Sequence, residues 1–535
     1  MEEKAVKQKV MKVLDKYPAA VYKNRKEHVV IKDENTCEPQ TITANTRTIP
    51  GIITTRGCCY AGCKGVVLGP LRDALIITHG PIGCGYYSWG TRRNKGRTVG
   101  DEKNFLNYCF STDLQEGDIV FGGEKKLRKA VKDAVEIFHP ESIMICSTCP
   151  VGLIGDDINA VAKWATQEFG IQTLAFSCEG YKGVSQSGGH HIANNNLIKN
   201  VIGTGDKVVG KYSINLLGEY NIGGDGWEAE RILRKIGYEV VSVMTGDGTV
   251  EQLRNSHKAN LNLVQCHRSI NYIGEMMKTK YGIDWIKVNF VGVKSTIKAL
   301  RDTALYFGDQ ELINRTEAVI ADELADITPA LNEFKRVCEG KTAALFVGGS
   351  RAHHYQKLFE DIGIKTILAG YEFAHRDDYE GRDVLPTVKL DGDSKNIESI
   401  EVEADPQFYK VYLSKEQAEN LKDKMELNTY GGMINEMDDG SIVVDDLNHF
   451  ETEEFIKALK PDIFCSGIKD KYIAHKQGIF SKQLHSYDYS GPYAGFKGAV
   501  NFARDIAMGI ATPSWSYVNP PWKTEPMLEG QYVGG

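Results

Sequence analysis

The sequence has no uninterrupted apolar run of about 18 residues, which a membrane-spanning helix would require. Residues 1–17 are charged throughout and lack the apolar segment of a secretory signal. There is no excess of positive charge either, because the formal net charge of the 535 residues is −7, and a nucleic-acid-binding surface needs a basic footprint. We therefore expect a cytoplasmic protein that binds neither membranes nor nucleic acid.

Nucleotide-binding motifs are also missing. The sequence contains no phosphate-binding loop of the form G-x-x-x-x-G-K-[ST], and no convincing G-x-G-x-x-G follows an expected strand. If the activity uses ATP, we expect a partner protein to bind it.

Strand-like and helix-like segments alternate along most of the chain. Short apolar runs such as ALIITHG (74–80) and TAALFVGGSR (342–351) end in turns, and amphipathic segments such as 270–282 follow. This alternation predicts an α/β protein with parallel sheets. We expect three doubly wound, Rossmann-like domains after an N-terminal arm, and a charge-rich insertion in the third domain. The expected ranges are 1–50 for the arm, 51–210, 211–345 and 346–535 for the domains, and about 380–432 for the insertion.

The chain contains 12 cysteines, which in a reducing compartment favour metal binding or simple burial over disulfides. Three lie in glycine-rich turns: Cys58 in RGCCYAGC, Cys84 in HGPIGC and Cys149 in CSTCPVGLIGDD. Glycine leaves room for a bulky group, and thiolates suit iron–sulfur clusters and zinc. Burial as a structural thiol carries about equal weight for any single cysteine. Burial alone is expected for Cys59, Cys63, Cys109 and Cys338.

Three thiolates are too few for most closed clusters, so a second polypeptide would have to supply the remaining ligands. The sequence thus points to a site at a subunit interface.

Basic, amide and thiol side chains follow several of the expected strands. In open α/β sheets, ligands bind beyond the carboxyl ends of the strands, so these side chains would surround a strongly anionic guest. A single histidine or arginine in such a loop is more often a structural group, and the inference depends on their number. The set comprises Arg92, Gln186, His190, Cys266, Arg268, Ser269, Arg351, Lys469, Gln483 and His485.

Taken together and in this order, these motifs resemble the alpha subunits of molybdenum nitrogenases from about residue 25 to near the C-terminus. The insertion resembles that of clostridial-type members. The resemblance implies reduction of dinitrogen to ammonia with release of hydrogen. It implies an α2β2 heterotetramer with a beta subunit, and an iron protein homodimer that binds ATP and delivers electrons from reduced ferredoxin or flavodoxin. Dinitrogen and protons are the implied substrates.

The resemblance also implies two cofactors. Cys58, Cys84 and Cys149 would hold one half of the P-cluster, an 8Fe-7S cluster shared with the beta subunit. Cys266 and His485 would bind opposite ends of the iron–molybdenum cofactor, Mo-7Fe-9S-C with homocitrate, and leave its waist free for substrate.

The remaining residues of the pocket are implied to surround that cofactor. Val66, Gln186 and His190 would lie at the waist, and His190 would donate a hydrogen bond and deliver protons. Arg92 and Arg351 would balance its charge. The other implied contacts are backbone N–H groups of Gly348 and Gly349, the homocitrate neighbours Gln186, Lys469 and Gln483, and Tyr220 and Ser269 in the same environment. Phe121 resembles a residue that meets the iron protein.

Two alternatives remain at this point. A vanadium or iron-only enzyme would share most motifs, but Arg351 in GGSR and the string HSYDYSGPY resemble the molybdenum type, whereas iron-only relatives carry lysine in place of that arginine. A cofactor-assembly scaffold would share the fold and the cluster cysteines. Such a scaffold is not expected to keep the whole pocket, and here Cys266 and His485 are both present.

Overall fold

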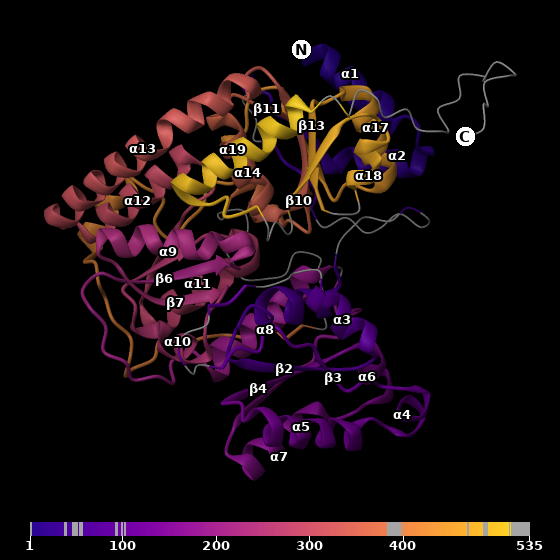
Figure 1. The fold of residues 1–535 in the computed structure, drawn as a ribbon, viewed down its shortest axis with the longest axis vertical. Coiled ribbons are helices and arrows are strands. Elements are labelled where there is room, and N and C mark those ends of the chain that lie inside the picture. The colour runs from indigo at the N-terminus through magenta and orange to yellow at the C-terminus, as the bar shows by residue number, and fades with distance from the viewer. Residues whose placement is uncertain are drawn as a thin grey trace, which may run out of the picture.

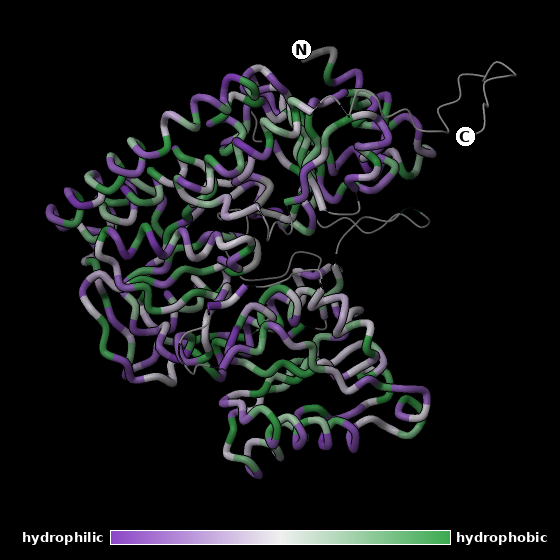
Figure 2. Tube along the Cα trace, viewed as in Figure 1, coloured by the Kyte–Doolittle hydropathy of each residue, from purple (hydrophilic) through white to green (hydrophobic). Residues whose placement is uncertain are grey.

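A computed structural model of the chain describes most of the sequence, and its polypeptide forms three stacked lobes, each built on its own sheet (Figure 1). Hydrophobic residues concentrate along the strands inside each lobe, and hydrophilic residues along the outer faces of the helices (Figure 2). The described residues are 3–36, 40–44, 52, 57–90, 95–97, 100, 103–183, 185–381, 397–398, 400–467, 470–484, 490–512 and 514.

The first lobe contains a four-stranded parallel sheet in the order β3-β2-β4-β5. Its strands are β2 (Ala74–His79), β3 (Phe110–Ser111), β4 (Ser142–Ser147) and β5 (Gln172–Phe176). Every residue of β2 and β4 is buried, as expected for parallel strands covered on both faces. One face packs on α5 (Glu124–Phe138) and α7 (Ile158–Phe169), and the other on the π-helical segment η2 (Ala61–Leu68) and α8 (Gln186–Asn200). The lobe also contains α3 (Ile82–Gly90), α4 (Glu116–Phe121) and α6 (Cys149–Ile154).

The second lobe repeats this design with the strand order β7-β6-β8-β9. Its strands are β6 (Ser213–Glu219), β7 (Glu239–Thr245), β8 (Leu261–Val264) and β9 (Asp284–Lys287). Its helices are α9 (Asp225–Ile236), α10 (Val250–Asn255), α11 (His267–Tyr281), α12 (Val293–Phe307) and α13 (Gln310–Cys338). The long helix α13 runs beside α19 (Gly495–Ala511) and joins this lobe to the third (Figure 1).

The third lobe has a six-stranded sheet in the order β1-β12-β11-β10-β13-β14, in which only β1 is antiparallel. Its strands are β1 (Val29–Ile31), β10 (Thr342–Gly348), β11 (Lys365–Glu372), β12 (Ile442–Asp445), β13 (Ile463–Ser466) and β14 (Phe480–Gln483). Its helices, besides α19, are α14 (Gly349–Asp361), α15 (Arg376–Glu380), α17 (His449–Leu459) and α18 (Lys471–His475). The predicted α/β class with parallel sheets is confirmed, and β10 spans the expected boundary near residue 345.

The N-terminal segment is attached to the third lobe by a buried ion pair. Its helices are α1 (Glu3–Leu14) and α2 (Ala19–Arg25), and α1 packs on α17. Arg25 contacts Glu451 through two hydrogen bonds of 2.6 and 2.7 Å, and both side chains are buried. The Tyr17 hydroxyl donates a third hydrogen bond, of 3.0 Å, to the same carboxylate. This pair and the β1–β12 pairing hold the expected arm against the third sheet.

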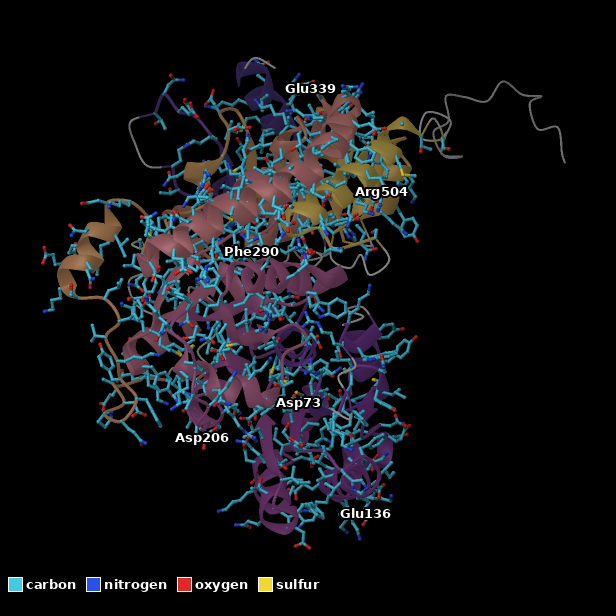
Figure 3. The ribbon with its side chains drawn as sticks, turned by 60° about the vertical axis from the view of Figure 1, so that its left-hand side comes forward. Asp73, Glu136, Asp206, Phe290, Glu339 and Arg504 are labelled. Carbon is cyan, nitrogen blue, oxygen red and sulfur yellow. The ribbon has the colours of Figure 1, made fainter. Side chains whose placement is uncertain are left out.

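The described part of the expected insertion reaches across to the second lobe (Figure 3). The Lys410 N–H donates to the Tyr281 carbonyl at 3.0 Å, and Tyr412 stacks on Tyr306 with ring centroids 5.5 Å apart. The segment contains the exposed helix α16 (Lys415–Lys422). It therefore connects two lobes rather than projecting from one.

Among the residues described, none of the helices combines the length and hydropathy that crossing a membrane would need.

Replacing Glu451 by alanine is expected to weaken the attachment of the N-terminal segment, because Arg25 would stay buried without its carboxylate partner. The expected loss of stability is about 3–5 kcal/mol, measured as a lower unfolding temperature and faster proteolysis within the first 30 or so residues. Glu453→Ala removes an exposed carboxylate from the same helix and should cost less than about 1 kcal/mol. Equal effects of the two substitutions would contradict this account.

Candidate metal-cluster sites

Several candidate residues lie where the strand order of a sheet reverses. The reversals fall between β2 and β4, between β6 and β8, and between β10 and β13. The chain leaves such neighbouring strands toward opposite faces, so a crevice opens beyond their carboxyl ends. Candidate residues that follow these strands are Cys84 after β2, Cys149 after β4, Tyr220 after β6, Cys266 after β8, and Gly348 and Gly349 at the end of β10.

Cys58, Cys84 and Cys149 form one cluster, called here the outer thiol group. A Cβ atom on Gly180 would lie 3.1 Å from the Cys149 Sγ and 3.3 Å from the Cys58 Sγ. The Gly180 N–H donates to the Cys149 Sγ at 3.2 Å. Burial raises the pKa of Cys84, and the neighbouring Cys58 and Cys149 raise it further. Three adjacent thiols resist joint ionisation unless a cation lies between them, and this property fits a metal cluster.

The outer thiol group opens onto the surface. Cys58 and Cys84 are exposed and Cys149 is half-buried. Large apolar side chains surround these thiols and are themselves exposed, namely Ile82, Tyr86, Tyr87, Leu153 and Tyr181. An exposed apolar patch of this kind marks a protein contact surface. The residues thus fit a cluster whose other side is covered by a second chain.

Two glycines let η2 and α8 pack backbone against backbone. A Cβ atom on Gly62 would overlap the Gln186 carbonyl oxygen, and one on Gly189 would overlap the Cys59 carbonyl oxygen. No other residue type fits at either position without moving a backbone segment. The π-helical form of η2 is itself uncommon and is found frequently at functional sites. We call this contact the glycine seam.

The glycine seam brings several candidates together. Val66 on η2 and His190 on α8 are both buried, with 4% and 2% of their surfaces exposed. Gln186 begins α8, and its side-chain oxygen lies against Gly57, directly before Cys58. Gln186 thus contacts the turn that carries the first thiol of the outer group.

A phenylalanine that the sequence analysis did not single out connects His190 to the third lobe. The rings of His190 and Phe373 meet edge to face with centroids 5.9 Å apart. A Cβ atom on Gly348 would lie 2.8 Å from the Phe373 Cζ. Phe373 adopts a left-handed φ of 46°, and its N–H donates to the Asp446 carboxylate at 2.8 Å. The structure therefore places His190 and Gly348 against the same aromatic ring.

Cys266 lies at the end of β8, directly before α11, and its thiol is half-buried. Gly218 on β6 has a left-handed φ of 76°. Because it has no side chain, the β6 backbone can approach the Cys266 backbone; a Cβ atom on Gly218 would lie 2.8 Å from the Cys266 nitrogen. Tyr220 is buried at the same edge of the sheet. The next residue, His267, places its Nδ1 2.8 Å from the Asp378 carboxylate, and both are buried. This contact ties the Cys266 turn to the third lobe.

Tyr272 joins α11 to the other two lobes. Its ring lies 4.7 Å from that of His191 on α8 and 6.5 Å from that of His375, which directly precedes α15. The segments carrying Cys266, His190 and Gly348 therefore meet at one place between the lobes. Neither the His267–Asp378 contact nor the Tyr272 contacts were expected, since only the fold brings these segments together.

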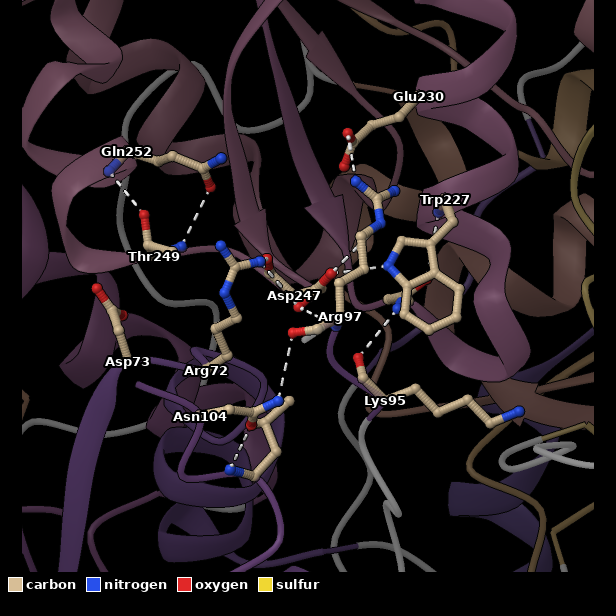
Figure 4. Close-up of polar contacts among 12 residues, drawn as sticks. Arg72, Asp73, Lys95, Arg97, Asn104, Trp227, Glu230, Asp247, Thr249 and Gln252 are labelled. Atoms are coloured by element: carbon tan, nitrogen blue, oxygen red, sulfur yellow. Dashed lines mark hydrogen bonds and ion pairs between the residues drawn. The ribbon is translucent and has the colours of Figure 1, made fainter. Parts of the chain in front are cut away.

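The second lobe fixes the segment that follows Arg92 (Figure 4). The Asn221 side chain donates to the Lys95 carbonyl at 3.0 Å, and the Arg97 N–H donates to the Asp247 carboxylate at 3.1 Å. The indole of Trp227 donates to the same carboxylate at 2.8 Å. Arg92 itself lies outside the described residues.

The remaining candidates are described only in part. Lys469 and His485 lie outside the described residues, and for Ser269 and Arg351 only the backbone is described, in α11 and α14. Gln483 is the last residue of β14 and is half-buried.

The burial expected for four cysteines is confirmed at Cys59, Cys63 and Cys338. It is wrong at Cys109, which is exposed because it precedes the two-residue strand β3 at the edge of its sheet.

Comparison with known proteins identifies the family. A model of nitrogenase component 1 type oxidoreductases matches residues 58–511. The nitrogenase molybdenum-iron protein alpha chain of Clostridium pasteurianum is 57% identical over 525 residues, which cover 98% of each chain. The chain belongs to this family.

Other molybdenum-iron protein alpha chains are also similar to it. That of Methanosarcina barkeri is 51% identical over 98% of each chain, and that of Azotobacter vinelandii is 38% identical over 98% of this chain and 97% of the relative. A solved structure titled nitrogenase Cp1 at pH 6.5 is 57% identical, has a TM-score of 0.93, and matches 96% of this chain and 100% of that one. The expected nitrogenase alpha chain is thus confirmed, and no match named here is a vanadium, iron-only or scaffold protein.

Gly180→Val is expected to separate the thiols of the outer group, because its side chain would press on Cys58 and Cys149. Purified protein should then contain much less iron, measured by elemental analysis, without a large change in circular dichroism. Gly117→Val on α4 is the control, since a Cβ at that position meets no atom within 4 Å. Unchanged iron in Gly180→Val would show that this close approach is not needed.

Proposed function

We propose that this chain is the alpha subunit of a molybdenum nitrogenase, which reduces dinitrogen to ammonia and releases hydrogen. The observation that carries the proposal is the convergence of three segments: those of Cys266, His190 and Gly348 meet inside the protein, while a separate thiol group opens onto its surface. A buried site for substrate and a surface site for electron entry are the two parts such an enzyme requires.

The outer thiol group would hold half of an 8Fe-7S P-cluster. Cys58, Cys84 and Cys149 would act as thiolate ligands, and a beta subunit seated on the surrounding apolar patch would supply the others. The Gly180 N–H, which already donates to the Cys149 sulfur, would stabilise a negatively charged ligand there. Two such pairs of chains would form the α2β2 heterotetramer.

The central space would hold an iron–molybdenum cofactor, Mo-7Fe-9S-C with homocitrate, between Cys266 and His485. When bound, this group supplies the multi-electron reduction of dinitrogen. Positive charge nearby suits an anionic guest: the half-buried Lys287 ammonium donates to His354 Nε2 at 2.9 Å and lies close enough to Cys266 to interact electrostatically. Burial lowers the pKa of Lys287, and the charge of Cys266 opposes that decrease.

The other pocket residues would position and tune the cofactor. Arg92 and Arg351 would balance its charge, and the N–H groups of Gly348 and Gly349 would donate to sulfur. Gln186, Lys469 and Gln483 would surround homocitrate, with Tyr220 and Ser269 nearby. Such contacts around a cluster set its orientation and potential.

Two buried side chains would act at the waist of the cofactor. The Val66 side chain would limit access to one face. His190, held by the Phe373 ring, would donate a ring N–H into the substrate space and pass protons there, for which the titration range of histidine is suited.

Electrons would arrive from an iron protein homodimer, which binds and hydrolyses ATP and is itself reduced by ferredoxin or flavodoxin. The absence of phosphate-binding motifs from this sequence agrees with ATP binding by a partner. At the end of α4, Phe121 is 89% exposed beside exposed Val120, and this tip would contact the iron protein. The assembly would work in the cytoplasm on dinitrogen and protons.

Cys266→Ala should abolish retention of the cofactor at one end and leave the outer thiol group intact. Anaerobically purified protein is expected to keep P-cluster iron but contain little molybdenum, measured together by elemental analysis. Cys109→Ala removes an exposed thiol and should leave both metals unchanged. Normal molybdenum content in Cys266→Ala would refute the ligand role.

His190→Gln should impair dinitrogen reduction more than proton reduction, because a specific donor and proton carrier is lost while the metal content stays normal. Ammonia and hydrogen are measured in parallel assays with equal electron supply. If both products decrease in the same proportion, His190 has no specific role in dinitrogen reduction.

A further inference from the structure

A second cluster of three cysteines lies in the interior of the first lobe and is not used by the proposed function. The Sγ atoms of Cys63, Cys146 and Cys178 all lie within 4.8 Å of one another, and all three residues are fully buried. They come from different elements: η2, the end of β4, and the segment after β5. We call them the inner thiol group.

The inner thiol group has nearly the dimensions of a metal site. A zinc–sulfur bond is about 2.3 Å long, so three sulfurs around one ion lie about 3.8–4.0 Å apart. The observed separations of up to 4.8 Å require side-chain movements of less than an ångström to reach this spacing. Thiolates are the ligands that soft metal ions prefer.

A buried cation sits beside these thiols. Lys64 follows Cys63 in η2, is buried, and lies close enough to Cys146 to interact electrostatically. Three thiolates, one divalent ion and one ammonium group sum to zero charge, which favours a divalent ion in a dry interior.

The inner thiol group differs from the outer thiol group in its exposure to solvent and to partner chains. The two groups share two segments of chain, since Cys58 and Cys63 flank the start of η2, and Cys146 and Cys149 flank the end of β4. The outer thiols open toward a partner, but the inner sulfurs are sealed and a second chain could not reach them. Any group bound there belongs to this chain alone.

We propose that Cys63, Cys146 and Cys178 bind one divalent, thiophilic metal ion of the zinc class, in a closed site behind the outer thiol group. Zinc usually takes four ligands. The three thiolates would supply three of these ligands, and the Tyr60 hydroxyl, which interacts electrostatically with Cys146 and Cys178 but hydrogen-bonds to the Thr78 hydroxyl at 2.6 Å, would have to turn from that partner to supply the fourth. The ion would stabilise the two segments that also carry Cys58 and Cys149.

The test is elemental analysis of the anaerobically purified complex from cells grown with added zinc. The complex should contain one zinc ion per chain beyond its iron and molybdenum, and X-ray absorption at the zinc edge should show mainly sulfur neighbours. Cys146→Ser should reduce zinc to background and leave iron and molybdenum unchanged. The control Cys109→Ser should retain zinc.

The inference would be overturned if the unaltered complex contained no zinc, or if Cys146→Ser retained its zinc. It would also be overturned if Cys146→Ser lost iron together with zinc, because the inner thiols would then be part of the outer cluster. If Cys146→Ser does not fold, Cys178→Ala is measured with the same criteria. Zinc without iron or molybdenum in the unaltered complex would contradict the proposed function and leave the inner site standing.

Discussion

The reversal of strand order in each of three parallel sheets is the constraint on which the rest of this structure depends. Chain segments that leave neighbouring strands toward opposite faces leave a crevice at the carboxyl edge, where side chains can gather without disturbing the sheet. Cys84 and Cys149 occupy the first crevice, Cys266 the second and Gly348 the third. One buried hydrophobic cluster runs through all three lobes, and the polar and thiol groups gather at the carboxyl edges of the sheets.

The glycine seam then determines how closely the first lobe approaches that space. Because Gly62 and Gly189 lack side chains, η2 and α8 meet backbone to backbone. Val66 on η2 and His190 on α8 are both buried near this contact. The same η2 segment carries Cys63 and follows Cys58, so both thiol groups depend on this contact. A structural feature without any reactive group thereby positions Val66, His190, Cys58 and Cys63.

Much of this arrangement could be predicted from the sequence, because alternating strands and helices imply parallel sheets and place strand-end residues at a shared edge. Contacts between distant segments could not. Phe373 meets His190, and His267 meets Asp378, only through packing of separate lobes. The inner thiol group was missed for the same reason, since Cys63 taken alone resembles any buried cysteine.

The central claim is that a molybdenum-containing group lies where the segments of Cys266, His190 and Gly348 meet. Anomalous diffraction at the molybdenum edge, from crystals of the anaerobically purified complex, tests it most directly. The account predicts one molybdenum peak per chain in the space bordered by Cys266, His190 and Gly348, with iron at Cys58, Cys84 and Cys149. A molybdenum peak elsewhere, or apolar side chains filling that space, would contradict it.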